Sequence, residues 1–461
     1  MMRTVVVMTL SLLGALTLEG TPVMPIAITN VTVVNPCRDA GDAGQTVIVE
    51  DGYIRAIQAA SVPLPSGARR IDGARKFLIP GLWDAHVHLT KGGLNTLPLY
   101  IANGVTAVRD MGSDLQEVQA WRAQIEAGAL VGPRIKTAGP MLESPANVER
   151  MKQQQTIEPI DRLRVSVGGP NEAREVVNRL AAAGADLIKV RTTQNPSTFR
   201  AIADAAKRQG LPLAAHPFAP PEDLRQDAVR SIEHFVAYPP LNDRTAVQRR
   251  ALFANLAHAG LFMSTTLANV DQSLLVPHDE SVRRLQDRKG MLDSRRKYAC
   301  GYLVEDWREQ VDEKKDEPIG PFRVLLPGFF RDLRELRDAR VRFLAGTDVG
   351  VAFMYPGFSL HDELEILVRR VGFRPMEALR IATRHAPMFF GIDRTMGCVE
   401  PGHVADLVLL DANPLSDIVN TRKIRGVMTT GHWFDRAALD RLLSGVEQAC
   451  LQPARQTPNA R

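Results

Sequence analysis

Short runs of alternating or β-branched apolar residues occur near both ends of the chain. Residues 27–34 and 46–57 have the pattern of strands, with an Asp-Gly hairpin signal at 51–52. Similar runs recur at 405–410 and 424–434. We therefore predict that both ends of the chain contribute to one small β-structure.

Between these ends, apolar strand-like runs alternate with stretches of helical periodicity. Examples of the latter are Glu172–Ala183, Thr198–Gln209 and Pro375–Thr383, the last with proline in its first turn. This order predicts an α/β fold with a (β/α)8 TIM-like barrel. A doubly wound open sheet is the competing architecture, but the sequence has no Gly-x-Gly-x-x-Gly motif to support it. The predicted barrel strands are Leu78–Val87, Val105–Arg109, Arg134–Ala138, Leu187–Val190, Pro212–His216, Ser231–His234, Gly260–Thr266 and Val341–Thr347.

These patterns divide the 461 residues into three predicted parts. The parts are a signal peptide at 1–20, a composite β-sandwich domain from 25–77 and 392–461, and a barrel at 78–391. Two long connections, at 143–164 and 268–340, each follow a strand. We expect both to lie over the carboxyl-terminal face of the barrel, where active sites of this fold are built.

The first residues are typical of a secretory signal. Arg3 precedes an apolar run from Thr4 to Leu18, which is shorter than the roughly twenty residues that a membrane span needs. We predict export to the periplasm or the medium, cleavage between Thr17 and Val23, and no stable membrane anchor. A buried N-terminal strand and a misassigned start codon are the alternatives.

Charge and cysteine content narrow the possible partners and cofactors. The chain has 57 basic and 52 acidic residues without a basic block, so a small-molecule substrate is expected and nucleic acid is not. A homo-oligomer is possible. The cysteines lack Cys-x-x-Cys spacing, which disfavours a thiolate zinc site. In an oxidising compartment, two of Cys37, Cys398 and Cys450 could pair, although free buried thiols are an equal alternative.

Metal-binding chemistry is indicated by polar residues at the ends of the predicted strands. His86 and His88 are two residues apart in a strand, so both imidazoles point to the same face. Imidazole and carboxylate bind Zn²⁺ and related ions, and the full set is large enough for two ions about 3.5–4 Å apart. The candidate ligands are His86, His88, Lys189, His216, His234 and Asp348.

Lys189 can join such a site only in a modified form. Burial lowers the pKa of a lysine, and its neutral amine can add carbon dioxide to give a carbamate whose two oxygens can bridge two cations. The alternative for Lys189 is an inward lysine paired with a carboxylate.

Several sequence motifs together are similar to those of the amidohydrolase superfamily. Within it the chain resembles the imidazolonepropionase/prolidase-like branch that carries a carboxylated lysine. The motifs are Pro80-Gly-Leu-Trp-Asp-Ala-His-Val-His88, Val105-Thr-Ala-Val-Arg-Asp110, Gly132-Pro-Arg134, Ile188-Lys-Val190, Ala215-His216, Ser231-Ile-Glu-His234, Gly346-Thr-Asp348 and Glu400-Pro-Gly-His-Val-Ala-Asp-Leu-Val408.

The resemblance implies a role for each candidate ligand. His86 and His88 would bind a buried ion, His216 and His234 a more exposed one, and carbamylated Lys189 would bridge the two. Zinc is the expected metal. Asp348 would contact the buried ion and act catalytically, as a proton shuttle between a metal-bound hydroxide and the leaving nitrogen.

The sequence identifies the substrate less closely than it identifies the metal ligands. Thr137–Glu143 lacks the histidine that peptidase-type relatives carry after the third strand, and no glutamate follows His216 as in deaminases. Arg191 and Tyr238 could bind a substrate carboxylate or oxyanion, with surface packing as the alternative. We predict hydrolysis of a dipeptide or an N-acyl amino acid. A lactonase or carbamate or ester hydrolase, and a catalytically silent metal-binding protein, are the alternatives.

Overall fold

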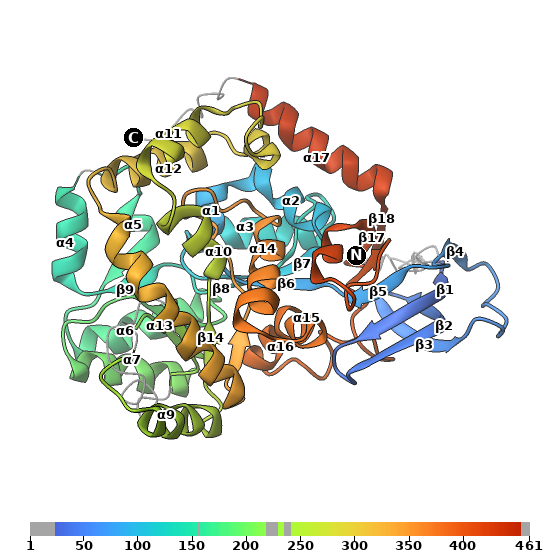
Figure 1. Cartoon of the computed structure of the whole chain (residues 1–461), viewed down its shortest axis with the longest axis horizontal. Coiled ribbons are helices and arrows are strands. Elements are labelled where there is room, and N and C mark those ends of the chain that lie inside the picture. Colours follow the sequence, from blue (N-terminus) through green and yellow to red (C-terminus); the bar gives the residue numbers. More distant parts are fainter. Residues whose placement is uncertain (1–23, 155, 218–228, 235–240, 453–461) are drawn as a thin grey trace, which may run out of the picture.

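A computed structural model of the chain describes residues 24–154, 156–217, 229–234 and 241–452 (Figure 1). The predicted signal peptide at 1–20 lies outside these residues, so it stays a prediction. Within the described ranges, no helix combines the length and the apolar character that a membrane crossing requires.

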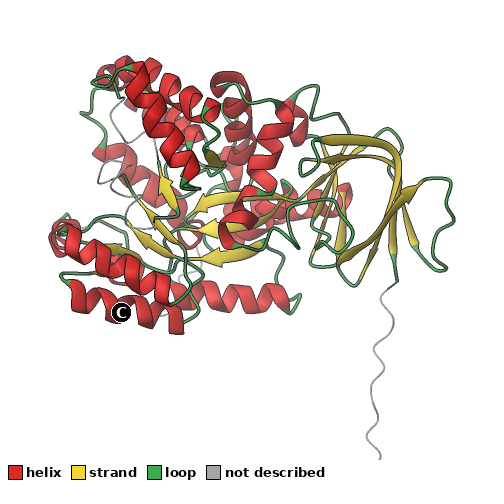
Figure 2. Ribbon diagram, turned by 90° about the horizontal axis from the view of Figure 1, so that it is seen from below, coloured by secondary structure: helices red, strands yellow, loops and turns green. Residues whose placement is uncertain are grey.

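Strands from both ends of the chain form one eight-stranded sheet, seen on the right of Figure 2. The strand order is β18-β17-β16-β5-β1-β2-β3, with β4 paired to β1. The antiparallel pairing of β16 with β5 joins the two chain ends. The strands are β1 Ile26–Asn35, β2 Ala40–Glu50, β3 Tyr53–Ala59, β4 Arg69–Asp72, β5 Phe77–Pro80, β16 Leu407–Leu410, β17 Ile424–Thr429 and β18 His432–Asp435.

Alternation along these strands gives the sheet its own apolar cluster. Val47 and Val49 in β2 pack with Leu407 and Leu409 in β16, because residues two apart in a strand share a face. A single sheet made by both chain ends is what the sequence pattern predicts. The sandwich form and the domain limits stay predictions.

Parallel strands form the second part of the α/β fold. Two sheets, with orders β10-β9-β11-β12-β13-β14-β15 and β6-β7-β8, are joined at both seams by backbone hydrogen bonds. The amide of Ala85 donates to Ala345 O, and the amide of Asp186 donates to Thr137 O, each at 2.8 Å, so the strands close into a barrel. The strands are β6 Leu82–Val87, β7 Val105–Asp110, β8 Arg134–Thr137, β9 Met141–Glu143, β10 Arg164–Ser166, β11 Ile188–Val190, β12 Leu213–Ala215, β13 Ser231–Glu233, β14 Phe262–Ser264 and β15 Arg342–Leu344.

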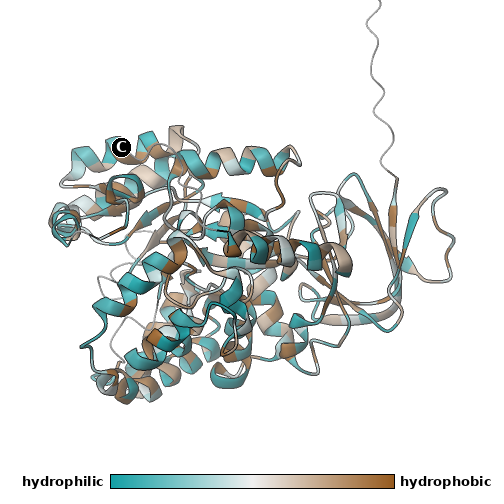
Figure 3. Cartoon of the chain, turned by 90° about the horizontal axis from the view of Figure 1, so that it is seen from above, coloured by the Kyte–Doolittle hydropathy of each residue, from teal (hydrophilic) through white to brown (hydrophobic). Residues whose placement is uncertain are grey.

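Helices surround the parallel strands (Figure 2). They show teal and brown residues along their length in Figure 3, as expected for helices with one buried face. The longer helices are α3 Leu115–Glu126, α4 Pro145–Gln153, α6 Pro170–Ala182, α7 Pro196–Arg208, α9 Ala246–His258, α11 His278–Gln286, α12 Tyr302–Glu313, α13 Ile319–Asp338, α14 Ser359–Ile366, α15 Pro375–Thr383 and α17 Arg436–Leu451. The shorter ones are α1 Leu89–Gly92, α2 Leu97–Ala102, α5 Ile160–Leu163, α10 Leu267–Asn269 and α16 His385–Phe390.

Two predicted elements differ in the structure. The single strand expected over Leu78–Val87 divides at Gly81, whose amide donates to Asp406 O, so β5 joins the small sheet and β6 the barrel. The C-terminal segment after β18 is helical rather than β, because Asp435 caps the N-terminus of α17 through the amide of Ala438.

The cysteines form two disulfides, Cys37–Cys398 and Cys300–Cys450. The first is one of the pairings that the sequence allowed. The omission of Cys300 from the candidates was wrong, and so was the free-thiol alternative. Helix α17 leaves the small sheet, packs along α2 and carries Cys450 back to the long connection between β14 and β15 (Figure 1).

Candidate active site and metal centre

The predicted site residues lie where parallel strands end at one face of the barrel, the usual position of an active site in this fold. His86 is in β6 and His88 follows it directly. Asp348 lies in the loop after β15. The remaining candidates are Lys189 in β11, His216 just after β12 and His234 just after β13.

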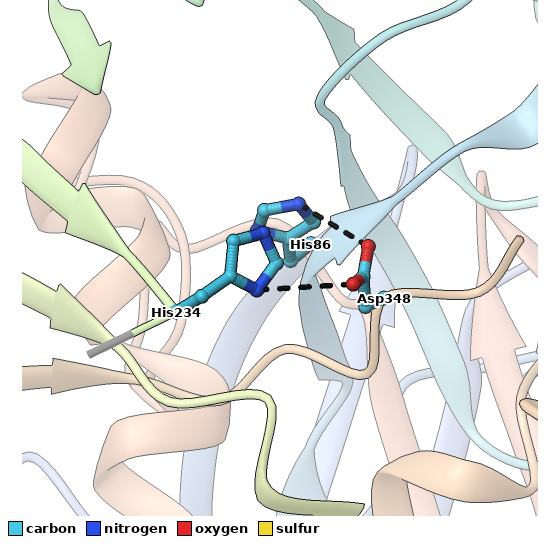
Figure 4. A group of neighbouring side chains, drawn as sticks. All are labelled: His86, His234 and Asp348. Carbon is cyan, nitrogen blue, oxygen red and sulfur yellow. Dashed lines mark ion pairs between the residues drawn. The ribbon is translucent and has the colours of Figure 1, made fainter. Parts of the chain in front are cut away.

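The carboxylate of Asp348 lies among three histidines. Its Oδ1 is 3.5 Å from Nε2 of His86 and 3.2 Å from Nε2 of His88. Its Oδ2 is 3.7 Å from Nδ1 of His234. One ligand atom each from His86, His234 and Asp348 lie within 4.8 Å of one another (Figure 4). The structure therefore brings these four residues from β6, β13 and β15 to one point.

Hydrogen bonds set the tautomers of the first two histidines. Nδ1 of His86 lies 2.8 Å from Glu233 Oε2, and Nδ1 of His88 lies 3.0 Å from the carbonyl of Gly112. A carboxylate and a carbonyl only accept hydrogen bonds, so both Nδ1 atoms carry the proton. In the neutral imidazoles the lone pairs are then on the two Nε2 atoms, which face the same oxygen of Asp348.

This donor set fits a divalent cation. Nε2 of His86 is buried and makes no hydrogen bond within the described part of the chain. Two lone pairs and a carboxylate oxygen repel one another unless positive charge lies between them. A histidine that binds a metal through one ring nitrogen while donating its other N–H to a carboxylate is a common arrangement, and Glu233 gives His86 this partner.

The electrostatics also favour metal ligands. Burial, reinforced by neighbouring positive charges, holds the pKa of His86 and His216 well below the usual range for histidine. Burial likewise lowers the pKa of His234 to about 4, although Asp348 opposes the shift. The three imidazoles are therefore neutral at pH 7, which is the form that binds metals.

His216 is connected to this group through ring contacts. Its ring centroid is 4.8 Å from that of His234, which in turn lies 4.4 Å from the ring of His86. The imidazoles of β6, β12 and β13 therefore form a continuous row across the barrel mouth.

Lys189 is a buried lysine without a hydrogen-bond partner among the described residues. Burial lowers its pKa to about 7, against the opposing effect of Glu233. Near neutral pH, a substantial fraction of the amine is therefore unprotonated. This environment fits the carbamate predicted from the sequence, because only a neutral amine adds carbon dioxide.

An unusual backbone conformation positions the side chains of His234 and Asp348. His234 and Asp348 have φ angles of 57° and 64°, in the left-handed region that non-glycine residues rarely adopt. Such residues concentrate at functional sites. Gly346 permits the close approach of the β15 loop to β6, since a Cβ there would lie 2.5 Å from the Cβ of His86.

Sequence reasoning missed the residues that support His86. The buried carboxylate of Glu233 accepts from Nη2 of Arg109 at 2.7 Å as well as from His86. Asp110, the neighbour of Arg109 in the chain, instead accepts from the hydroxyls of Ser113 and Thr137. The alternation of Ser231 and Glu233 in β13 was the available signal, since it directs both side chains into the barrel.

The two predicted substrate contacts have different outcomes. Arg191 is one-third exposed, and its Nη1 lies 3.1 Å from Glu143 Oε1, so its charge is already paired. Tyr238 lies outside the described residues. Neither is placed as a substrate ligand by the geometry.

Comparison with known proteins finds one matching protein family and several similar enzymes. The sequence profile of the amidohydrolase family matches residues 77–434. Imidazolonepropionase of Ralstonia nicotianae is 28% identical over 407 residues, which are 83% of this chain and 90% of the relative. Ochratoxinase of Aspergillus niger is 25% identical over 379 residues, which are 74% of this chain and 71% of that enzyme.

A similar solved structure agrees with the sequence matches. A putative prolidase from Bifidobacterium longum superposes with a TM-score of 0.67 and 26% identity, covering 92% of this chain and all of that one. The resemblance noted from the motifs is thereby confirmed, including its imidazolonepropionase and prolidase-like branch.

Proposed function

This chain belongs to the amidohydrolase family, and from that premise we propose that its substrate is a dipeptide or an N-acyl amino acid. It is a metal-dependent hydrolytic enzyme that acts on C–N bonds. The observation that carries the proposal is the Asp348 carboxylate facing the lone pairs of His86 and His88. The similarity to a putative prolidase supports a peptide-like substrate.

We assign two divalent ions, preferably zinc, to this donor set. His86, His88 and Asp348 would hold one ion, His216 and His234 the other, and a carbamate on Lys189 would be shared. When bound, such ions lower the pKa of water and polarise a carbonyl group.

Asp348 is the group that moves the proton. Although burial raises its pKa, His234 and His88 hold it well below the usual range, so the carboxylate is ionised at neutral pH. Nδ2 of Asn269 lies 3.4 Å from Oδ2 and orients the group. Asp348 accepts the proton of the attacking water and donates it to the leaving nitrogen, which breaks the C–N bond.

Metal removal tests the assignment. Purified protein is treated with a chelator, reloaded with Zn²⁺ or Mn²⁺ with and without bicarbonate, and assayed on Xaa-Pro dipeptides, N-acyl amino acids and matched esters. We expect activity to disappear with the metal and return on reloading. We also expect about two bound ions per chain when bicarbonate is present. Protein reloaded without bicarbonate, and the Lys189→Met variant, should bind fewer ions.

Three outcomes would contradict parts of this proposal. Full activity in metal-free protein would exclude the metal role. Turnover of esters with none of any amide would favour the ester or lactone alternative. Equal metal content in Lys189→Met and in the wild type would exclude the shared carbamate.

Export of the protein is also proposed, from the N-terminal apolar run together with the two disulfides. Stable disulfides are typical of proteins that fold in oxidising compartments. We expect cell fractionation to recover the protein outside the cytoplasm, with an N-terminus between Thr17 and Val23 on sequencing. Recovery of the intact chain in the cytoplasm would refute export.

A further inference from the structure

A cavity of about 140 Å³ lies in the long connection between β14 and β15, next to the loop that carries Asp348. Apolar side chains such as Val311 and Phe353 form part of its wall. The polar lining comes from Ser273, His278, Ser281, Gln310, Lys314 and Glu317. None of these residues has a role in the metal site described above.

Hydrogen bonds attach the cavity wall to the site. Gln310 in α12 donates from Nε2 to the carbonyl of Gly350 at 2.7 Å and accepts from the amide of Ala352 at 2.9 Å. Both partners belong to the loop that follows Asp348. Ser273, which also lines the cavity, lies one helical turn after Asn269, which contacts Asp348. The loop that follows Asp348 and the helical segment from Asn269 to Ser273 therefore contribute both to the cavity wall and to the surroundings of the Asp348 carboxylate.

Lys314, at the C-terminal end of α12, brings a positive charge to this cavity. Its ammonium group makes no ion pair with a described carboxylate, and its hydrogen bond to Ser273 Oγ is long, at 3.4 Å. Burial lowers the pKa of Lys314, while Glu317 and Asp348 raise it. The carboxylate of Glu317 lines the same cavity without forming an ion pair with the ammonium, which can therefore still meet an anion.

Arg191, the other cation considered for binding a substrate carboxylate, is less available than Lys314 for binding an anion. Arg191 shares Glu143 with Arg164, so the carboxylate of Glu143 already occupies its guanidinium. His278, by contrast, lines the cavity with a buried Nε2 that has no hydrogen-bond partner in the described ranges. A ligand in the cavity can thus meet the ammonium of Lys314 and a ring nitrogen of His278 without a described partner, beside the carboxylate of Glu317.

We infer that Lys314 binds the free carboxylate of the substrate and makes the enzyme select C-terminal acids over their neutral amides. This inference rests on the proposed function and identifies which residue recognises the amino-acid part of the substrate. The apolar wall then faces the side chain of that amino acid.

The test compares Lys314→Met with Lys315→Met, a control at the neighbouring exposed position. Kinetics are measured on the fastest dipeptide or N-acyl amino acid of the panel and on its carboxamide. We expect Lys314→Met to raise KM for the acid about 10- to 100-fold and to leave the carboxamide nearly unchanged. Lys314→Arg should restore most of the loss, and Lys315→Met should match the wild type.

Equal losses on the acid and on the carboxamide would overturn the inference, because they would indicate a structural role. Binding of N-acetyl-L-proline and of its carboxamide, measured by calorimetry on metal-loaded protein, separates this result from a failure of the proposed function. If the wild type hydrolyses no amide, at least tenfold weaker binding of the acid to Lys314→Met still supports the carboxylate site. Equal binding by the two proteins refutes it.

Discussion

Replacement of Asp348 by asparagine is expected to lower kcat by about 10²- to 10⁴-fold, the range for loss of a positioned proton-transfer group. Asparagine has nearly the same shape, so the contacts with His86, His88 and Asn269 can persist. It cannot accept a proton from water, and the expected defect is therefore in kcat rather than in KM. Steady-state kinetics per metal-loaded site give the measurement.

The control for this prediction is Asp411→Asn, which changes an exposed carboxylate paired with Lys76 in the small sheet. It should have wild-type kinetics. Elemental analysis of Asp348→Asn separates loss of the proton acceptor from loss of metal. A fully metal-loaded Asp348→Asn enzyme with wild-type kcat would exclude Asp348 as the proton acceptor.

Replacement of Arg109 by methionine is expected to destabilise the fold by about 3–5 kcal/mol, as found when one partner of a buried ion pair is removed. The Arg109 and Glu233 side chains are fully buried, with Nη2 of Arg109 2.7 Å from Oε2. Nη1 also donates to Ser231 Oγ at 3.0 Å, and Nε to the carbonyl of Ala85. The variant leaves an uncompensated carboxylate in the barrel.

Urea unfolding of the metal-free protein, followed by tryptophan fluorescence, measures this effect. Arg38→Met is a matched control, because Arg38 pairs with Glu400 at 2.8 Å on the surface, where such pairs contribute about 0–1 kcal/mol. The double variant Arg109→Met/Glu233→Gln should recover part of the stability, since its buried carboxylate is neutralised. A change below about 1 kcal/mol in Arg109→Met would contradict the assigned role of the pair.

The predictions for Asp348→Asn and Arg109→Met concern two different roles in the same site. In the proposed mechanism, Asp348 exchanges a proton with the reacting atoms. Arg109 acts through Glu233, which sets the tautomer of His86. We therefore expect Arg109→Met to weaken metal binding as well as the fold, because residues that orient a ligand typically change metal affinity 10- to 100-fold.

Sequence patterns with local causes were good predictors of the structure. His86 and His88 share a face because strand side chains alternate, and parallel strands bring the residues at their carboxyl ends together. The positions of Lys189, His216, His234 and Asp348 at strand ends follow from the same rule. The family resemblance was carried by these motifs and is confirmed by the match over residues 77–434.

Only the tertiary structure decided which distant groups meet. Glu233 and His86 are 147 residues apart, and Cys300 and Cys450 are 150 residues apart, so no periodicity could pair them. The path of α17 and the placement of Lys314 beside the Asp348 loop likewise depend on how the long connection packs. The sequence by itself determined the family, the barrel and the candidate metal ligands, because local periodicity and chain order control them. Packing determined the partners of those ligands, the second disulfide and the cation in the cavity, because these contacts join segments with no local relation.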